Sequence, residues 1–141
     1  MALQYYPKEG EILVCDYTGF SAPEMTKSRP VIIVSPRLRR RSDLVTVVPL
    51  STTAPQTIED YHFRIELAVP LPPPFGAPEM WAKCDMISTV ALTRLDRFKS
   101  VRRPHGGART WLSGQLTKPQ ILAVKRSLLC GLGLSSLTVH L

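Results

Sequence analysis

The stretch Arg29-Pro30-Val31-Ile32-Ile33-Val34-Ser35 is a nearly continuous run of β-branched residues, and it decides the fold class. A second run, Leu44-Val45-Thr46-Val47-Val48-Pro49-Leu50, follows after an arginine-rich turn. β-branched side chains favour strands, and the absence of a clean apolar–polar alternation indicates strands that are buried on both faces or lie in a small barrel. Pro30 has no N–H for a sheet, so we expect it at the first position of its strand or on an edge.

Further strand signals lie on both sides of these runs. Residues 11–17, after Gly10, are rich in β-forming residues, and the polar segment 18–28 with Gly19 and Pro23 predicts a mobile loop. The stretch 61–67 alternates between apolar and polar residues and predicts a half-exposed strand. Residues 80–86 predict another strand, which 88–92 continues beyond a bend.

The C-terminal half adds a proline-rich segment and a helix. Residues 69–78 contain five prolines and predict an extended loop. Thr117 is a natural N-cap with Pro119 in the first turn, and apolar residues at helical spacing predict a helix over 117–132. The tail 135–141 is expected to add an edge strand or to remain irregular. Short strands, one helix and no alternation of strands with helices predict a single domain over 1–141, mainly β, with an antiparallel barrel and a C-terminal α-helix.

The composition narrows the class of protein. Forty-four per cent of the 141 residues are hydrophobic, which is typical of a globular chain. Neither an apolar run long enough to span a membrane nor a signal peptide is encoded, so we expect no membrane association and a cytoplasmic location. Cys15, Cys84 and Cys130 are widely spaced, which predicts free thiols and no metal site.

The charge points to a polyanionic partner. The formal net charge is +7, and the basic residues form two groups. The first group is Arg37, Arg39, Arg40 and Arg41; the second is Arg94, Arg97, Lys99, Arg102, Arg103 and Arg109. The two groups are either solvated loops or two walls of a groove that follows a phosphate backbone.

Four blocks of the sequence resemble the MazF/PemK toxins of type II toxin–antitoxin systems. In chain order the blocks are 10–17 (GEILVCDY), 24–36 (EMTKSRPVIIVSP), 47–52 (VVPLST) and 83–86 (KCDM). The resemblance covers roughly the first 95 residues. It implies an SH3-like barrel, a homodimer, and an endoribonuclease that cleaves single-stranded RNA without a cofactor.

The same residues are chemically suited to metal-free RNA cleavage. The reaction needs a base for the 2′-OH, an acid for the leaving 5′-oxygen and a cation for the charge on phosphorus. Arg29 offers a planar fork of donors for phosphate, and Glu24 is a base or orients one. Alternatively, Arg29 pairs with Asp16 or Glu24 as a structural ion pair.

The resemblance also assigns the other site residues. The family's main catalytic pair corresponds to Arg29 and Ser51, with Thr52 adjacent; a serine where threonine is usual leaves the choice of hydroxyl open. Asp85 matches an aspartate used by PemK-like relatives, while Lys83 replaces their arginine. The expected RNA contacts are Lys27, Lys83, Arg37, Arg39, Arg94 and Arg97.

The expected partners are single-stranded RNA and a cognate acidic antitoxin, with DNA reached only through that antitoxin. Two rival functions remain. One is a non-catalytic relative that binds RNA or its antitoxin, which Ser51 and Lys83 favour. The other is a topoisomerase poison on the same barrel, which would not need Arg29 and Glu24 as a phosphate-binding group.

Overall fold

The computed structural model describes residues 3–101, 105–108 and 110–141. Arg102, Arg103 and Arg109 of the second basic group lie outside the described residues. The strands are β1 (Glu11–Cys15), β2 (Arg29–Ile33), β3 (Leu44–Ser51), β4 (His62–Ile65), β5 (Met80–Lys83), β6 (Ser88–Ala91), β7 (Leu95–Asp96), β8 (Phe98–Lys99), β9 (Trp111–Leu112) and β10 (Gly114–Gln115). The helix α1 (Lys118–Gly131) packs beside them, and the short 3-10 helices are η1 (Cys84–Met86), η2 (Leu92–Arg94) and η3 (Ser135–His140).

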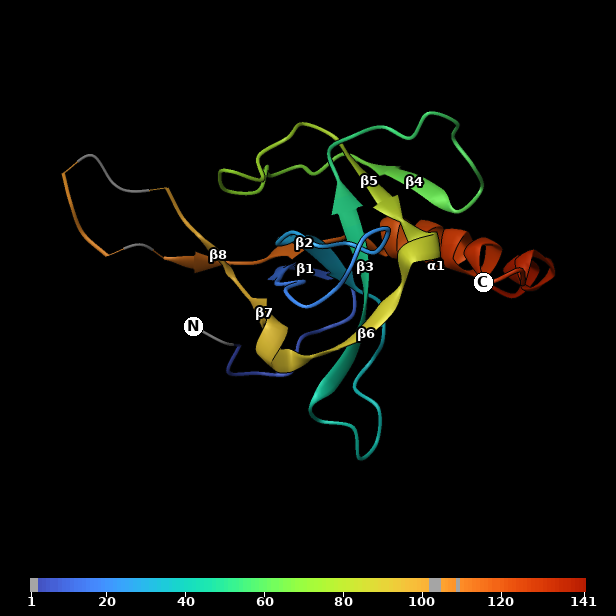
Figure 1. The fold of residues 1–141 in the computed structure, drawn as a ribbon, viewed down its shortest axis with the longest axis horizontal. Coiled ribbons are helices and arrows are strands. Elements are labelled where there is room, and N and C mark those ends of the chain that lie inside the picture. The colour runs from blue at the N-terminus through green and yellow to red at the C-terminus, as the bar shows by residue number, and fades with distance from the viewer. Residues whose placement is uncertain (1–2, 102–104, 109) are drawn as a thin grey trace.

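The main sheet is antiparallel and runs in the order β10-β1-β2-β3-β5-β4, with β6 paired to β3 and β7 paired to β1 (Figure 1). The mainly β class with one C-terminal helix is therefore confirmed. Pro30 is the second residue of β2, and the pairing of β2 with β3 covers only Val31–Ile33. The missing N–H of Pro30 thus lies outside that ladder.

The sheet is not closed as a barrel, because no pairing joins β4 to β10 among the described residues, although the fold class matches the predicted antiparallel barrel with a C-terminal helix. The proline-rich segment lies in this gap. Leu71 of that segment is buried in the core, and its Cδ2 atom would lie 3.2 Å from a Cβ built on Gly114 of β10. A segment of prolines cannot donate the hydrogen bonds that a closing strand needs, so it fills the gap with side chains.

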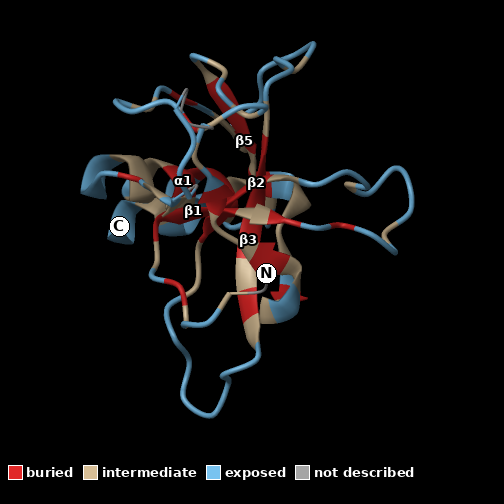
Figure 2. Cartoon of the chain, turned by 90° about the vertical axis from the view of Figure 1, so that its left-hand side faces the viewer, coloured by how far each residue is buried: buried red, intermediate tan, exposed pale blue. Residues whose placement is uncertain are grey.

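The strands β1, β2 and β3 bury both of their faces, as Figure 2 shows by the red colour at the centre of the molecule. On one face, here called the α1 face, Ile12, Ile32 and Leu50 pack in one cluster with Val124 and Leu128 of α1. The opposite face, here called the loop face, carries a second cluster. Its members are Leu13, Cys15, Tyr17, Val31, Ile33, Val45, Val47, Val90 and Leu95, covered by Phe20 and Met25 from loop 16–28.

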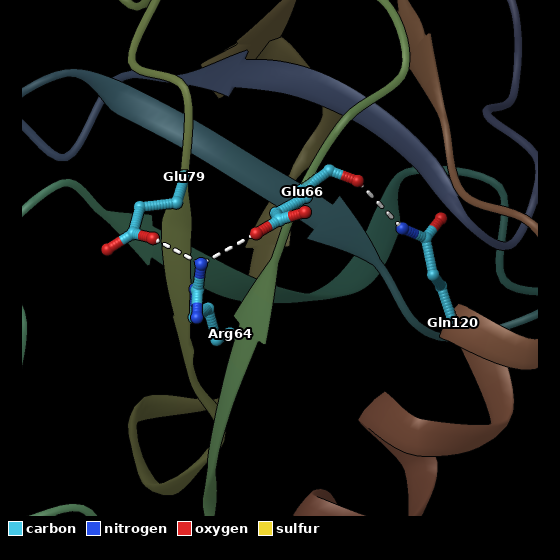
Figure 3. Close-up of polar contacts among 4 residues, drawn as sticks. All are labelled: Arg64, Glu66, Glu79 and Gln120. Atoms are coloured by element: carbon cyan, nitrogen blue, oxygen red, sulfur yellow. Dashed lines mark hydrogen bonds and ion pairs between the residues drawn. The ribbon is translucent and has the colours of Figure 1, made fainter.

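The helix begins as its sequence predicts. Thr117 and Gln120 form a reciprocal capping box at the N-terminus. Gln120 also donates from Nε2 to the carbonyl oxygen of Glu66 just after β4 (3.1 Å), and Arg64 of β4 bridges Glu66 (2.6 Å) and Glu79 (2.7 Å) (Figure 3). These contacts fix α1 against the β4–β5 hairpin.

The C-terminal tail differs from expectation. Residues 135–140 form the 3-10 helix η3 after α1, rather than an edge strand or an irregular end. Gly133 has a φ of +74° and ends α1, and Thr138 Oγ1 donates to the carbonyl of Ser135 (2.7 Å). The structure describes no helix that is both long and apolar enough to cross a membrane.

Candidate functional site

Arg29 and Ser51 lie on the loop face at corresponding positions of two neighbouring strands. The register of β2 and β3 pairs Val31 with Pro49. Extending this register by two residues sets Arg29 opposite Ser51, at the same end of the pair. Because side chains alternate along a strand, both share the face of Val31 and Val47. The two residues predicted to act together therefore project from one end of one face.

Two neighbouring strands bring further polar side chains to the same face. Trp81 of β5 is paired with Ser51, and Ser88 of β6 is paired with Val47. Directly paired residues in an antiparallel sheet have their side chains on the same side. Lys83, two residues after Trp81, has the same orientation along β5.

Buried polar atoms without hydrogen bonds gather on this face. In the described part of the chain, four buried side-chain atoms have no hydrogen bond of normal geometry: Tyr17 Oη, Arg29 Nε, Trp81 Nε1 and Ser88 Oγ. All four residues project from the loop face or its edge. An unsatisfied buried polar group costs about 1–3 kcal/mol, and such groups are rare in native structures. Their clustering indicates a place built for an additional hydrogen-bonding partner.

Tyr17 connects this cluster to Arg29. Its side chain is only 1% exposed, and its hydroxyl faces Ser88. Burial raises the pKa of Tyr17 far above its usual value, and the positive charge of Arg29 opposes that rise in part. The hydroxyl therefore stays protonated at any physiological pH and can donate a hydrogen bond.

A cavity of about 370 Å³ opens next to this cluster. Tyr17 and Ser88 line it together with Glu24 from loop 16–28 and Asp85 from η1. The structure thus brings the two predicted carboxylates into one cavity, which is bounded by two of the residues with unpaired polar atoms. Among the described residues, Arg29 forms no ion pair with Asp16 or Glu24.

The position of Asp85 is fixed by the end of α1. A Cβ atom built on Gly131 would lie 3.2 Å from the Cys84 carbonyl oxygen and 3.3 Å from the Asp85 Cα atom. The helix backbone therefore lies directly against η1. Tyr61 lies near Asp85 as well, and burial together with the Asp85 charge raises the pKa of Tyr61.

Loop 16–28, which carries Glu24 and Lys27, is held at its start by Arg94. The Arg94 Nη1 atom donates to the carbonyl oxygens of Asp16 (2.9 Å) and Thr18 (2.7 Å), and the guanidinium lies 5.0 Å from the centre of the Phe20 ring. Hydrogen bonds from Thr18 lower the pKa of the Asp16 carboxyl. Arg94, expected to contact RNA, thus has a role in shaping the loop.

The two candidate hydroxyls have different surroundings. Ser51 is partly buried, and its Oγ atom accepts a hydrogen bond from the Thr53 N–H (3.1 Å). Thr52 is exposed, lies beyond the end of β3 and makes no side-chain hydrogen bond in the described structure. The geometry therefore favours Ser51 as the partner of Arg29.

The other predicted RNA contacts are spread over the molecule. Arg37 and Arg39 are in the turn between β2 and β3, at the opposite end of this strand pair from Arg29, and the Arg37 guanidinium lies 5.6 Å from the centre of the Tyr6 ring. Lys27 is exposed in loop 16–28, and Lys83 is paired with His62 of β4. Arg97 lines a different cavity.

Tyr17, Trp81 and Ser88 were not among the predicted site residues. The alternation of Leu13, Cys15 and Tyr17 beyond β1 is a signal that could have placed Tyr17 on the face of Arg29. The places of Trp81 and Ser88 depend on the register of β3 with β5 and β6, which the sequence alone does not specify. In the described residues, no group of three or more His, Cys, Asp or Glu side chains is arranged to hold a metal ion.

Comparisons with known proteins agree with this architecture. Residues 8–128 match the model of a family described as PemK-like, MazF-like toxin of type II toxin–antitoxin system. The uncharacterized protein YifN of Escherichia coli K12 is 31% identical over 121 residues, which cover 72% of this chain and 80% of that protein. An uncharacterized protein of Haemophilus influenzae is 32% identical over 104 residues, covering 65% and 71% of the two chains.

Solved structures of similar fold come from the same class of toxin. MazF from Deinococcus radiodurans aligns with a TM-score of 0.57 and 16% identity, covering 92% of this chain and 99% of that chain. An endoribonuclease in complex with its cognate antitoxin from a mycobacterial species aligns with a TM-score of 0.55 and 23% identity, covering 92% and 97%. At these identities the likeness shows the shared fold.

Proposed function

Because the chain belongs to the PemK-like, MazF-like toxin family of type II toxin–antitoxin systems, we propose that it is a toxin that cleaves single-stranded RNA on the loop face. The observation that carries the proposal is the cluster of unpaired polar atoms around Arg29, next to a cavity lined by Glu24 and Asp85. A phosphate group offers the acceptor oxygens that buried N–H and O–H donors lack. Since the Arg29 Nε atom and the Tyr17 hydroxyl are buried, loop 16–28 shifts when RNA binds.

The proposed reaction is an in-line attack of the ribose 2′-oxygen on the adjacent phosphorus. The new bond is 2′-O–P, and the bond that breaks is P–O5′, which leaves a 2′,3′-cyclic phosphate and a 5′-OH. Glu24 takes the proton of the 2′-OH, and Asp85 assists proton delivery to the leaving 5′-oxygen. Arg29 and the Ser51 hydroxyl hydrogen-bond the non-bridging oxygens, where charge builds in the transition state.

The proposed partners follow from charge and family. The net charge of +7 favours RNA as substrate and an acidic antitoxin as inhibitor. One of the similar structures is described as an endoribonuclease in complex with its cognate antitoxin. We propose the same pairing here, with a homodimeric toxin that acts in the cytosol and reaches DNA only through its antitoxin.

The test is digestion of a mixed-sequence single-stranded RNA by the purified protein in excess EDTA. We expect the cleavage activity to co-elute with the protein in the last chromatography step. The products should carry 2′,3′-cyclic phosphate and 5′-OH ends. Activity that is lost in EDTA and restored by magnesium would contradict the mechanism. A folded protein that binds the RNA without cutting it would support the non-catalytic relative instead.

A further inference from the structure

A second, larger cavity lies beside the β7–β9 segment, and the proposed cleavage site does not use it. Its volume is about 590 Å³. One wall comes from the segment that contains β7, β8 and β9, and the other comes from Pro73, Pro74 and Phe75 of the proline-rich segment. The fold therefore brings two regions that are 21 to 38 residues apart in sequence together around an open space.

The walls of this cavity offer flat apolar surfaces. Trp111 of β9 lines the cavity and is only partly buried. Phe75 lies on the opposite wall, where it packs edge-on against the buried Phe98 with ring centres 5.7 Å apart. Partly exposed aromatic rings of this kind are the surfaces on which unpaired bases stack.

Cations accompany the aromatic rings. The Lys99 Nζ atom lies 5.3 Å from the centre of the Trp111 ring, and the Arg97 guanidinium carbon lies 6.0 Å from the centre of the Tyr5 ring. Both residues line the cavity. Interleaved cations and aromatic rings favour a ligand that combines a planar ring with an anionic group.

The combination of cations and rings distinguishes the possible anionic ligands. The lining also contains Asp96, whose carboxylate accepts a hydrogen bond from the Arg97 N–H (2.8 Å). An acidic peptide offers charge for Arg97 and Lys99 but no planar ring for Trp111, whereas a nucleotide offers both a phosphate and a base. The chemistry of the cavity therefore favours a nucleotide over an acidic peptide.

We propose that this cavity binds one unpaired nucleotide of the RNA at a position outside the scissile step. The base stacks on Trp111, and Arg97 and Lys99 bind the adjoining phosphate. This inference rests on the proposed function, since it extends the path of the same RNA substrate.

The cavity lies at the β7 edge of the sheet, whereas the cleavage site lies on the loop face. Phe98 and Val14, which line the cavity, belong to or pack against the α1-face cluster, while Tyr17 of the cleavage site belongs to the loop-face cluster. Among the described strands β7 pairs only with β1, so an RNA strand that reaches both cavities passes over this edge of the sheet. The RNA path therefore follows the short segment that contains β7.

The experiment uses the tryptophan fluorescence of the protein with a short RNA whose 2′-hydroxyls are methylated, so that it cannot be cut. The chain has two tryptophans, and Trp81 lies at the proposed cleavage site, so the part of the quenching that is lost in Trp111→Ala is the part that reports on Trp111. We expect strong quenching in the wild type and an affinity about tenfold lower in Trp111→Ala, as measured by anisotropy of a labelled RNA.

Controls separate stacking from loss of structure and from general charge. Leu112→Ala, on the same strand at an exposed position outside this cavity, should bind as the wild type does. Lys99→Ala should reduce the slope of log Kd against log salt by about one, while Lys118→Ala at the start of α1 should leave that slope unchanged.

The outcomes distinguish the subsite from the cleavage proposal. If the RNA quenches the wild-type fluorescence and Trp111→Ala binds the RNA more weakly than the wild type, the subsite is supported even when the wild type cuts no RNA. A wild type that cuts RNA while Trp111→Ala and wild type have equal affinities for the methylated RNA overturns the subsite alone. Binding of an acidic peptide that depends on Trp111, with no such dependence for RNA, assigns the cavity to a protein partner and also overturns it.

Discussion

The two faces of the β1–β2–β3 sheet have different chemistry although the same strands form both. The α1 face is a continuous apolar cluster in which Val124 and Leu128 of α1 pack on Ile12, Ile32 and Leu50. The loop face has a similar apolar base, but at one end it carries four buried polar atoms that lack hydrogen bonds. One face therefore stabilises the fold, and the other keeps hydrogen-bonding capacity for a ligand at the expense of stability.

This difference predicts that substitutions on the two faces change different measured quantities. Substitutions on the α1 face should lower the free energy of unfolding and leave the chemistry of the folded protein unchanged. Substitutions at the polar end of the loop face should lower the rate of RNA cleavage and leave stability equal or higher. Each prediction below tests one side of this distinction.

The largest expected effect is on cleavage by Arg29→Ala. Losing one donor to the transition-state charge should lower kcat/KM by a hundredfold or more, because the phosphate charge is then poorly stabilised. Arg29→Lys keeps the charge without the planar fork, so it should recover only part of the activity. The measurement is single-turnover cleavage, with circular dichroism as the check on folding. Near-wild-type cleavage by a folded Arg29→Ala protein would remove Arg29 from the site.

On the α1 face, Leu128→Ala should lower the free energy of unfolding by about 2–4 kcal/mol, since it leaves a cavity under the helix. Leu122 is 44% exposed on the same helix, and Leu122→Ala should change that free energy by less than about 0.5 kcal/mol. Urea titration measures both. If Leu128→Ala lowers kcat of the folded enzyme as strongly as it lowers stability, the two faces are not functionally separate.

Removing either candidate hydroxyl, that of Ser51 or that of Thr52, should lower activity less than Arg29→Ala does. Ser51→Ala is expected to lower kcat by about tenfold or more, because Ser51 faces the same side as Arg29. Thr52→Ala should cleave RNA at nearly the wild-type rate, because Thr52 is exposed beyond the strand. The reverse order of the two variants would transfer the role to Thr52.

The smallest expected effect is that of Tyr17→Phe. The variant removes a buried hydroxyl that makes no normal hydrogen bond, so the free energy of unfolding should stay equal or rise by up to about 1 kcal/mol. RNA cleavage should fall severalfold if the hydroxyl supports Arg29 in the bound state. Thermal melting and cleavage of the same preparation provide the comparison. A clear loss of stability would show that the Tyr17 hydroxyl already contributes to the free protein.

The sequence predicted the parts of the molecule that local rules govern. The β-branched runs predicted β2 and β3, and Thr117 with Pro119 predicted the start of α1. The gap between β4 and β10 could not be predicted, because closure of the sheet depends on contacts between strands that are far apart in sequence. The 3-10 helix of the tail was missed because no side chain caps its start and its residues show no strong periodicity.

The site could be predicted only where strand alternation determines orientation. Arg29 and Ser51 follow from two strands and one turn, and the structure gives them matching register positions. Trp81 and Ser88 lie on the same face only because β3 pairs with two strands in turn. Its first half, 44–47, pairs with β6, and its end, Leu50 and Ser51, pairs with β5. Likewise, the hydrogen bonds of Arg94 to loop 16–28 join residues 76 and 78 positions apart, a contact that no local pattern specifies.

The proposed mechanism requires that the unpaired donors around Arg29 receive their partner from RNA. Nitrogen-detected NMR of the arginine Nε–H groups tests it directly, with the Arg29 signal assigned by its absence in Arg29→Lys. On saturation with a 2′-O-methyl RNA, we predict that the Arg29 Nε–H signal shifts downfield, as expected for a new hydrogen bond to phosphate, while the Arg37 signal moves little. An Arg29 signal that stays unchanged while the protein is saturated with RNA would contradict the claim.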